Sequence, residues 1–565
     1  MKPNLLPPID KQPGTEPFWT AANEGVLLLK HCPACNQTTW YPRSHCPLCG
    51  AEKTEWLKAS GHGSIYSFSI VRGAKRPTAV AVAVVEVPEG PSIVTTLTDC
   101  DVHAMQIGDP VALQFLQAEG DQQVPAFTTV AAQQARSYSR RAVQASRHVP
   151  DVPVLPPDFA WRGAAVVGAG TMGSGIATAL IAAGLTVCLI DRDEAALQRA
   201  RDTVAKNLSS LAQRGKLPEG VGAALDGVLR LGTSMSDVAG VNLVIEAVWE
   251  QLALKQEIFE AIDRHADADA LLATNTSTLD INLLASGIRR PESLLGLHFF
   301  SPAHVMPLLE LVRGERTRAD FVAAGAELGR RLGKTTVVVG VCDGFVGNRL
   351  FIARDQEANR LLYEGALPEQ IDRVLTEFGL PMGTFDLADM AAGIELGYRY
   401  RQARGESEPV GDSLFLAGRL GQKTGKGYYR YEPGKRRPLP DPEVTAIIEA
   451  VSKDMGIERR RLTDEEVRER LILPMINEGA KLVEEGIVIR PSDIDVVWQK
   501  GFGWPEWKGG PMYHADCLGL AHVHDRLLAL QQRHGERFRP ARLLKEFADK
   551  GRSFAQVVAD ASTTP

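Results

Sequence analysis

Over the middle of the chain, short apolar runs alternate with segments in which apolar residues recur at the helical period. Between residues 163 and about 340 the runs have the length of buried strands. The first two lie at 164–167 and 185–190, and the last lies at 336–341. Strands that alternate with helices in this order predict a doubly wound α/β domain built on a parallel sheet.

The regions on either side follow different patterns. Between residues 62 and 130, turn residues separate short strand-like runs, which predicts a small β-barrel. These runs are 64–71, 79–87, 92–97 and 111–116. Residues 131–161 are rich in Ala, Gln, Ser and Arg and then in Pro, which is typical of a linker.

After Asp343 the pattern is helical, and it contains an internal repeat. The first copy carries Glu357, Glu364-Gly365, Ile371-Asp372, Gly379-Leu-Pro381 and Asp389, and the second carries Glu478, Glu485-Gly486, Ile494-Asp495, Gly503-Trp-Pro505 and Asp516. The repeat predicts two all-α domains of about 100 residues each.

Composition narrows the class of protein. The 565 residues carry a formal net charge of −6 and a pI near 6.1, without the basic patches of a nucleic-acid-binding protein. We find no apolar run long enough to span a membrane, and the amino terminus lacks the apolar core of a signal peptide. We therefore expect a cytoplasmic protein without a nucleic-acid or membrane partner.

Four of the eight cysteines are clustered as two CxxC pairs, Cys32/Cys35 and Cys46/Cys49. Two such pairs present four thiolates to one ion, and in a cytoplasmic chain they indicate a metal site rather than disulfides. Because four thiolates fill a tetrahedral site, the predicted zinc is structural. A ribbon that folds without metal, or that holds iron, is the alternative.

A glycine-rich turn follows the first strand of the α/β region. In Gly168-Ala-Gly170-Thr-Met-Gly173 the first glycine permits the tight turn, the second lets the backbone approach a pyrophosphate, and the third lets helix pack on strand. Asp191 ends the next strand, where a carboxylate binds a ribose 2′-hydroxyl and repels a 2′-phosphate. The pattern predicts an NAD site, and the alternative is a glycine-rich turn in an ordinary α/β domain.

Further polar residues follow later strands, at the sheet edge where ligands bind in open α/β domains. Asn275 and Ser277 follow one apolar run, and His298 ends another. Glu310 lies inside an apolar run, where a carboxylate is costly unless it has a partner. A buried His298–Glu310 pair satisfies the carboxylate and fixes the imidazole tautomer, as a general base requires.

The amino-terminal region resembles an acyl-CoA-associated family of zinc-ribbon plus OB-fold proteins. The resemblance covers roughly residues 15–130 and rests on Gly25-Val-Leu-Leu-Leu-Lys30, the four cysteines and Gly63-Ser-Ile-Tyr-Ser-Phe68. Members of that family often accompany thiolases, which implies a docking module for a thiolase or another acyl-CoA enzyme. An OB-fold alone is equally typical of single-strand binding, but the acidic chain disfavours that use.

Residues 163–431 resemble the 3-hydroxyacyl-CoA dehydrogenase family, and residues 465–520 resemble the second helical repeat of its longer members. The matching motifs, in order, are Gly-Ala-Gly-Thr-Met-Gly (168–173), Asn-Thr-Ser (275–277), His-Phe-Phe-Ser-Pro (298–302), Glu310, Gly-Phe-Val-Gly-Asn-Arg (344–349) and Lys-Thr-Gly-Lys-Gly-Tyr (423–428). The second repeat departs from the pattern with Glu469 at the position of Asn348, so we expect it to be structural.

The resemblance implies roles for individual residues. His298 is the catalytic base, Glu310 orients it, and Ser277 and Asn348 position the substrate oxygen. Asn275, Glu250 and Lys255 line the nicotinamide and its ribose, although for Glu250 and Lys255 a solvated pair at a helix start is the alternative. The implied activity is an NAD-dependent (S)-3-hydroxyacyl-CoA dehydrogenase of a β-oxidation-type pathway.

Two other functions are weighed against this one: another NAD-linked hydroxyacid dehydrogenase, and an inactive acyl-CoA-binding scaffold. A homo-oligomer is compatible with the resemblance, but the tandem helical copy supplies within one chain a contact that is often made between subunits. The expected architecture is a zinc ribbon (15–60), an OB-fold β-barrel (61–130), a linker (131–161), a Rossmann-like NAD-binding domain (162–342), a first helical substrate domain (343–435) and a second helical repeat (443–550).

Overall fold

The computed structural model describes residues 6–71, 80–217, 225–391 and 393–556. These residues form two compact units. One comprises residues up to 138 together with 367–445 and 505–509, and the other comprises 139–366, 446–504 and the rest of the chain from 510.

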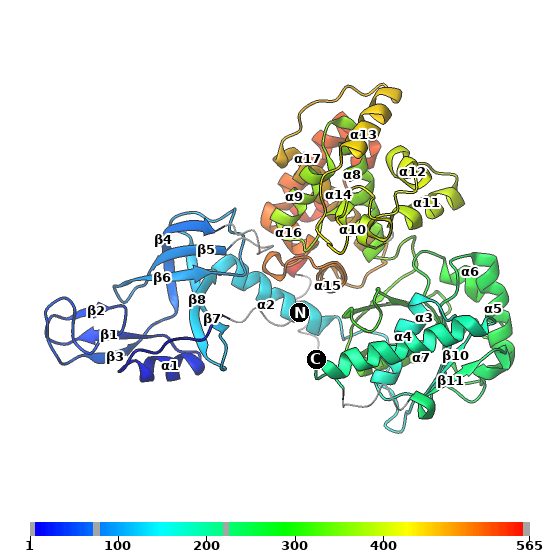
Figure 1. Ribbon diagram of the computed structural model, residues 1–565, viewed down its shortest axis with the longest axis horizontal. Coiled ribbons are helices and arrows are strands. Elements are labelled where there is room, and N and C mark those ends of the chain that lie inside the picture. Colours follow the sequence, from blue (N-terminus) through cyan, green and yellow to red (C-terminus); the bar gives the residue numbers. More distant parts are fainter. Residues whose placement is uncertain (1–5, 72–79, 218–224, 392, 557–565) are drawn as a thin grey trace. The chain divides into compact units, whose positions relative to one another are not determined.

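The first unit begins with a small cysteine-containing ribbon (Figure 1). After helix α1 (Glu16–Asn23), β1 (Leu28–Cys32) pairs with both β2 (Gln37–Thr39) and β3 (Glu55–Lys58) in antiparallel fashion. The first CxxC pair starts at the end of β1, and the second lies in the loop between β2 and β3. The apolar residues of this region, among them Phe18 and Leu29, are buried in one cluster with those of the following barrel, and the cysteines lie in or beside the short turns where a metal commonly stabilises a small fold.

A five-stranded barrel follows, closed in the order β4-β5-β6-β8-β7. Its strands are β4 (His62–Val71), β5 (Val80–Glu86), β6 (Ser92–Leu97), β7 (Pro110–Gln117) and β8 (Gln123–Thr129). The predicted barrel is confirmed, but its fifth strand, β8, was not expected. Pro125 lies in the middle of β8, where proline argues against a strand, and it is accommodated because β8 pairs with β6 at one residue only. Helix α2 (Val130–Ala145) begins one residue before the predicted linker (131–161) and fills its first half, so this half is a regular helix and not an irregular connection.

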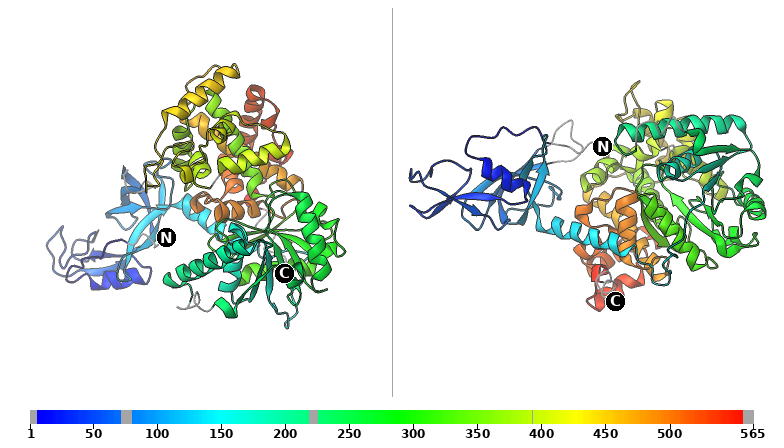
Figure 2. Two further views of the ribbon diagram at one scale, coloured as in Figure 1. Left: turned by 45° about the vertical axis from the view of Figure 1, so that its right-hand side comes forward. Right: turned by 90° about the horizontal axis from the view of Figure 1, so that it is seen from below.

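The α/β domain in the second unit is an eight-stranded sheet in the order β11-β10-β9-β12-β13-β14-β15-β16. Figure 2 shows this domain in teal and green, with helices packed around the sheet. The strands are β9 (Ala164–Val167), β10 (Val187–Ile190), β11 (Leu229–Gly232), β12 (Leu243–Glu246), β13 (Leu271–Thr274), β14 (Leu294–Phe299), β15 (Leu308–Val312) and β16 (Thr335–Val339). The order reverses beside β9, which makes the end of β9 the topological switch point where ligands bind in such folds.

The sheet differs from the expected all-parallel arrangement at one edge. β15 runs antiparallel to β14, and β16 runs parallel to β15. Only residues 300–307 connect β14 to β15, whereas a parallel crossover needs about a dozen residues or more. The short connection therefore reverses the chain and places β14 and β15 directly side by side.

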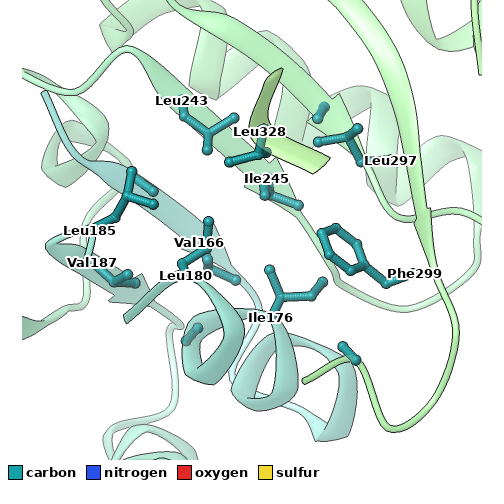
Figure 3. Packing of buried hydrophobic residues seen from close by; sticks show 14 of the residues in the cluster. Val166, Ile176, Leu180, Leu185, Val187, Leu243, Ile245, Leu297, Phe299 and Leu328 are labelled. Carbon is teal, nitrogen blue, oxygen red and sulfur yellow. The ribbon is translucent and has the colours of Figure 1, made fainter. Parts of the chain in front are cut away.

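Helices cover both faces of the sheet. The helices between the strands are α3 (Thr171–Ala182), α4 (Glu194–Gln213), α5 (Leu252–His265), α6 (Ile281–Ala285) and α7 (Ala319–Arg331). Figure 3 shows Ile176 and Leu180 of α3 and Leu328 of α7 against Val166 and Ile245 of the strands. Each fully buried side chain of this kind contributes about 1.5–3 kcal/mol. On the opposite face, α6 packs so closely that a Cβ on Gly296 of β14 would lie 2.5 Å from Ile281.

The remaining helices form the repeat region. They are α8 (Gly347–Glu364), α9 (Pro368–Phe378), α10 (Thr384–Met390), α11 (Gly393–Arg404), α12 (Pro409–Leu416), α13 (Pro442–Asp454), α14 (Asp464–Glu484), α15 (Pro491–Gly501), α16 (Pro511–Leu518), α17 (Leu520–His534) and α18 (Arg542–Asp549). In the described residues, no helix is long and apolar enough to cross a membrane.

The two copies of the repeat share the same internal contacts. Asp372 accepts hydrogen bonds from two successive backbone N–H groups at the start of α10, and Asp495 does the same at the start of α16. Asp389 and Asp516 also each accept from two successive N–H groups near the end of their copy. Burial raises the pKa of Asp372 to about 6 and that of Asp516 to about 6, although these donors lower it. The repeated aspartates therefore organise the fold of each copy.

Helices α8 and α14 join the two copies through reciprocal ion pairs. Arg349 at the start of α8 contacts Glu478 (3.0 Å) and Glu485 (2.5 Å) of the second copy. In the opposite direction, Arg470 of α14 contacts Glu357 and Glu364 of the first copy. Because corresponding residues exchange partners, the contact has the form of an isologous interface within one chain.

The Arg470 contact generates a stability prediction. Its side chain is 0% exposed, and removal of one partner from a buried ion pair typically costs about 3–5 kcal/mol. We expect Arg470→Ala to lower the free energy of unfolding by that amount, measured by chemical denaturation with tryptophan fluorescence. The control is Arg526→Ala, which removes a more exposed pair with Glu469 and should cost about 0.2–1 kcal/mol. Equal losses in both variants would contradict the prediction.

Candidate functional site

The glycine-rich turn lies at the switch point, between β9 and α3. Gly168 has a φ of 108°, and a Cβ there would lie 2.6 Å from the carbonyl oxygen of Ala247. A Cβ on Gly173 would lie 1.8 Å from the Gly168 oxygen. A Cβ on Gly170, which caps α3, meets nothing within 4 Å. The first and third glycines are therefore required by the fold, whereas the second faces open space at a helix N-terminus, as a phosphate site requires.

Asp191 follows the end of β10, beside this turn. One of its carboxylate oxygens accepts a hydrogen bond of 2.8 Å from the backbone N–H of Ala169, and the other accepts from the N–H of Asp193. The carboxylate is thus fixed next to the glycine-rich turn, where it fits the ribose of a dinucleotide.

A buried charge cluster supports the loop that follows β12. Lys255 is 1% exposed and contacts Glu246, which is 0% exposed, at 2.7 Å. Glu246 also accepts hydrogen bonds from the Thr274 hydroxyl and the Val248 N–H. The solvated-pair alternative is therefore wrong for Lys255, which is buried. Glu246 was missed in the sequence, where a charged residue at the end of the apolar run 243–245 was the available signal.

Glu250 lies in the same loop and organises the segment after β13. Its Oε1 accepts from the Thr276 hydroxyl (2.5 Å), the Ser277 N–H (2.8 Å) and the Thr278 N–H (3.2 Å). The other oxygen of Glu250 lies 3.4 Å from the Lys255 ammonium. Four of the predicted site residues therefore meet at this edge of the sheet: Glu250, Lys255, Ser277 and, beside Ser277, Asn275.

His298 and Glu310 form the predicted pair. They lie directly opposite each other on antiparallel β14 and β15, and His298 Nδ1 is 2.6 Å from Glu310 Oε2. Glu310 Oε1 accepts a hydrogen bond of 2.9 Å from the backbone N–H of Gly347. Both side chains are buried. With Nδ1–H donating to the carboxylate, Nε2 carries the lone pair and is the nitrogen able to accept a proton.

Two further contacts hold the histidine in place. Asn275 Oδ1 accepts from the backbone N–H of Phe299, which ties the end of β13 to the end of β14. The rings of Phe300 and Phe345 lie 4.5 Å and 5.8 Å from the imidazole ring. Asn348 directly follows Gly347 at the start of α8 and is half-buried. The sequence did not indicate the Gly347 N–H, because any residue except proline carries one.

The four clustered cysteines meet the requirements of a metal centre. Their sulfur atoms all lie within 4.8 Å of one another, with Cys32–Cys49 at 3.6 Å and Cys35–Cys46 at 3.8 Å. A tetrahedral zinc with bonds of about 2.3 Å separates its sulfur ligands by about 3.8 Å, whereas a disulfide needs about 2.05 Å. Backbone N–H groups of Cys49 and Leu48 lower the pKa of Cys46 to about 7, whereas burial and the neighbouring thiols raise that of Cys35 to about 12, so a bound cation is needed to hold all four as thiolates. The cluster therefore fits a closed tetrathiolate site.

Comparison with known families follows the same division of the chain. Residues 163–342 match the NAD binding domain of 3-hydroxyacyl-CoA dehydrogenase, and residues 344–431 and 467–557 match its C-terminal domain. Together these matches cover more than half of the chain. The chain belongs to the 3-hydroxyacyl-CoA dehydrogenase family. Its NAD-binding domain contains the glycine-rich turn, and both helical copies match the dehydrogenase C-terminal domain.

The amino-terminal module has its own matches. Residues 19–55 match the rubredoxin-like zinc ribbon domain of ChsH2, and residues 56–116 match the ChsH2 C-terminal OB-fold domain. The predicted combination of a zinc-ribbon and OB-fold module with a 3-hydroxyacyl-CoA dehydrogenase region is thereby confirmed.

Individual relatives agree with the family assignment. The peroxisomal bifunctional enzyme of Danio rerio is 40% identical over 385 residues, which are 65% of this chain and 53% of that protein. The crystal structure of 3-hydroxybutyryl-CoA dehydrogenase from Escherichia coli is 27% identical, with a TM-score of 0.60, over 69% of this chain and 99% of that one. The dehydrogenase part of multifunctional enzyme 1 from C. elegans is 29% identical, with a TM-score of 0.53, over 73% and 98%. The chain spans between 53% and 60% of the length of the curated relatives that it matches.

Gly170 allows cofactor binding to be tested without disturbing the fold. Because a Cβ on Gly170 meets no protein atom, we expect Gly170→Ala to keep the melting temperature of the parent chain. The added methyl group should displace a phosphate from the helix N-terminus, and loss of one charge-assisted contact weakens NAD binding about 10- to 100-fold. Calorimetric titration with NAD measures the effect.

Gly227→Ala is the matched control, since its Cβ also meets nothing within 4 Å and the position lies outside the turn. It should leave both the melting temperature and NAD affinity unchanged. Unchanged affinity in Gly170→Ala would show that phosphate does not bind at this turn.

Proposed function

We propose that the chain is an NAD-dependent (S)-3-hydroxyacyl-CoA dehydrogenase, which reversibly converts a 3-hydroxyacyl-CoA to the 3-oxoacyl-CoA in a β-oxidation-type pathway. The observation that carries the proposal is the buried His298–Glu310 pair, closed by the Gly347 N–H, in a chain that has the NAD-binding domain of this family.

In this mechanism His298 Nε2 takes the proton of the 3-hydroxyl group. Glu310 holds the imidazole in the required tautomer and stabilises the cationic ring that forms. Bound NAD supplies the acceptor for the hydride that leaves C3. A positioned base of this kind typically contributes about 10²–10⁴ in rate.

The neighbouring polar residues complete the site. Ser277 and Asn348 are the groups that orient the substrate oxygen toward His298. Glu250 supports this arrangement because it holds the backbone of Ser277 through its N–H. Asn275, which fixes the end of β14, would line the nicotinamide, and Lys255 would support the cofactor loop through its buried contact with Glu246.

The cofactor and metal residues follow from the same geometry. The turn formed by Gly168, Gly170 and Gly173 would hold the pyrophosphate, and Asp191 would bind the adenosine ribose, which favours NAD over its 2′-phosphorylated form. In the ribbon, Cys32, Cys35, Cys46 and Cys49 would hold one structural zinc ion.

The zinc-ribbon and OB-fold module is proposed to dock a thiolase or another acyl-CoA enzyme. Its metal site has no open coordination position for catalysis. The outer face of its barrel exposes apolar side chains, among them Val94 and Val82, which are 68% and 42% exposed. Val94 lies opposite Val84 on the neighbouring strand, so the apolar side chains are adjacent. Docking would raise the local concentration of 3-oxoacyl-CoA at the enzyme that consumes it.

Several finer expectations stay proposals. The linker aside, of which α2 occupies the first half, the domain borders expected from the sequence are proposed here, together with a cytoplasmic location and compatibility with a homo-oligomer. The (S) stereochemistry rests on family resemblance. The Danio rerio relative is named as a peroxisomal enzyme, and that location is not transferred to this chain.

The activity is tested by NADH absorbance with a panel of (S)-3-hydroxyacyl-CoAs that includes short, aromatic and dicarboxylic members. We expect His298→Ala to lower kcat about 10²- to 10⁴-fold, because the general base is lost. NAD affinity should not change. His265→Ala, at an exposed position on α5, is the control and should keep full activity. Turnover that survives in His298→Ala, or absence of turnover across the panel in the parent chain, would contradict the proposal.

Docking is tested with purified thiolase from the same organism. We expect the parent chain to co-elute with it in gel filtration, and Val94→Asp to weaken the complex about tenfold or more by placing a charge in the interface. Ser92→Asp introduces the same charge at another outward position of β6 and should weaken the complex less. No co-elution of the parent chain, or equal binding by both variants, would contradict the proposed surface.

A further inference from the structure

The second helical copy contacts the segment that connects the NAD-binding sheet to α8. Val488 forms an isolated antiparallel bridge with Val339 of β16, and the backbone N–H of Gly340 donates to the Ile487 carbonyl at 2.7 Å. At the other end of the segment, Arg349 is paired with Glu478 and Glu485. The segment therefore contacts the second copy at its start, seven residues before Gly347, and again two residues after Gly347, the donor to Glu310.

One aromatic residue of the second copy packs beside the ring that contacts the histidine. The ring of Phe502 lies 5.6 Å from that of Phe300 in an edge-to-face arrangement, and Phe300 lies 4.5 Å from the His298 ring. A Cβ on Gly347 would lie 2.7 Å from Phe502. Phe502 thus contacts Phe300, which packs on the His298 ring, and Gly347, whose N–H donates to Glu310.

Phe502 is itself held by a rigid support. It stacks on Trp498 at 4.3 Å with an interplanar angle of 18°, and Trp498 is fully buried in α15. A second stacked contact, at 6.0 Å, joins Phe502 to Phe351 of α8. Its position is therefore fixed from two helices, one in each copy.

The hydrogen bond from Nδ1 to Glu310 fixes one edge of the imidazole, and the plane of the ring depends on its packing against Phe345, which is fully buried, and Phe300. Phe300 lies beyond the end of β14 and is only half-buried, so the strand does not fix its side chain. Edge-to-face packing by Phe502 constrains the Phe300 ring, and through it one of the two rings that pack on the imidazole. The close contact with Gly347 likewise limits movement of the N–H group on which Glu310 depends.

We propose that Phe502, from the copy that lacks an active-site asparagine, is a positioning residue for the His298–Glu310 pair of the first copy. The inference rests on the proposed function. It makes the second copy a working part of the dehydrogenase site, acting through Phe300 and Gly347.

The experiment compares Phe502→Ala and the milder Phe502→Leu with Phe547→Ala. Phe547 is a buried aromatic residue of α18 in the same copy, so its truncation removes a similar side chain away from the site. We expect Phe502→Ala to lower kcat about 10- to 100-fold, since small displacements of a reacting group cost that much. The KM for NAD should stay unchanged, and Phe502→Leu should recover part of kcat. A loss of kcat in Phe547→Ala as large as that in Phe502→Ala would overturn the proposal.

A double-mutant cycle separates positioning from general stability. If Phe502 acts through the histidine pair, Phe502→Ala should lower kcat much less in a Glu310→Gln background than in the parent chain. Independent, multiplicative losses of kcat would overturn the proposal.

Hydrogen exchange gives a readout that does not depend on turnover. Peptides containing the Gly347 amide should exchange faster in Phe502→Ala than in Phe547→Ala, because the donor to Glu310 loses its support. This result is expected even if no panel substrate is turned over, so failure of the proposed function is distinguishable from failure of the inference. Equal exchange in the two variants would overturn it.

Discussion

The carboxylate of Glu310 is buried in an apolar strand, and the arrangement of the site depends on satisfying it. A buried charge is costly unless its oxygens are hydrogen-bonded. One oxygen faces His298 on the neighbouring strand, and the other accepts a hydrogen bond from Gly347, the first residue of α8. Both oxygens of Glu310 therefore have a hydrogen-bond partner. The sheet reversal makes this geometry available, because antiparallel β14 and β15 place residues 298 and 310 directly opposite each other.

The same constraint links the site to the helical repeat. Since Glu310 needs the Gly347 N–H, the start of α8 must be placed accurately. The second copy contacts this part of α8 twice: Glu478 pairs with Arg349, and Phe502 stacks on Phe351. The exchange of ion pairs between the copies gives one chain an interface of the kind that two subunits would otherwise form. A copy without its own active-site asparagine therefore still has a physical reason to be present.

A second buried charge network, around Glu246, organises the cofactor side of the site. Its carboxylate joins Lys255 to Thr274 and thereby connects the loops after β12 and β13. Glu250 then holds the backbone at Ser277. Both networks follow the same rule: the buried side chains of Glu246 and Glu310 have a hydrogen-bond partner on each oxygen, and these contacts fix the loops that carry the polar residues of the site.

By itself, the sequence determined the domain order, the cysteine cluster and the glycine-rich turn, because each depends on local spacing or on the local pattern of apolar residues. It also determined the pairing of His298 with Glu310, because a carboxylate inside an apolar strand needs a hydrogen-bonding partner. It did not reveal β8, where Pro125 weakens the strand pattern, or the buried state of Lys255. Nor did it reveal the roles of Gly347 and Phe502. A backbone N–H is present at almost every residue and a phenylalanine suits any core, so only tertiary packing between residues far apart in the chain decided which of them support the site.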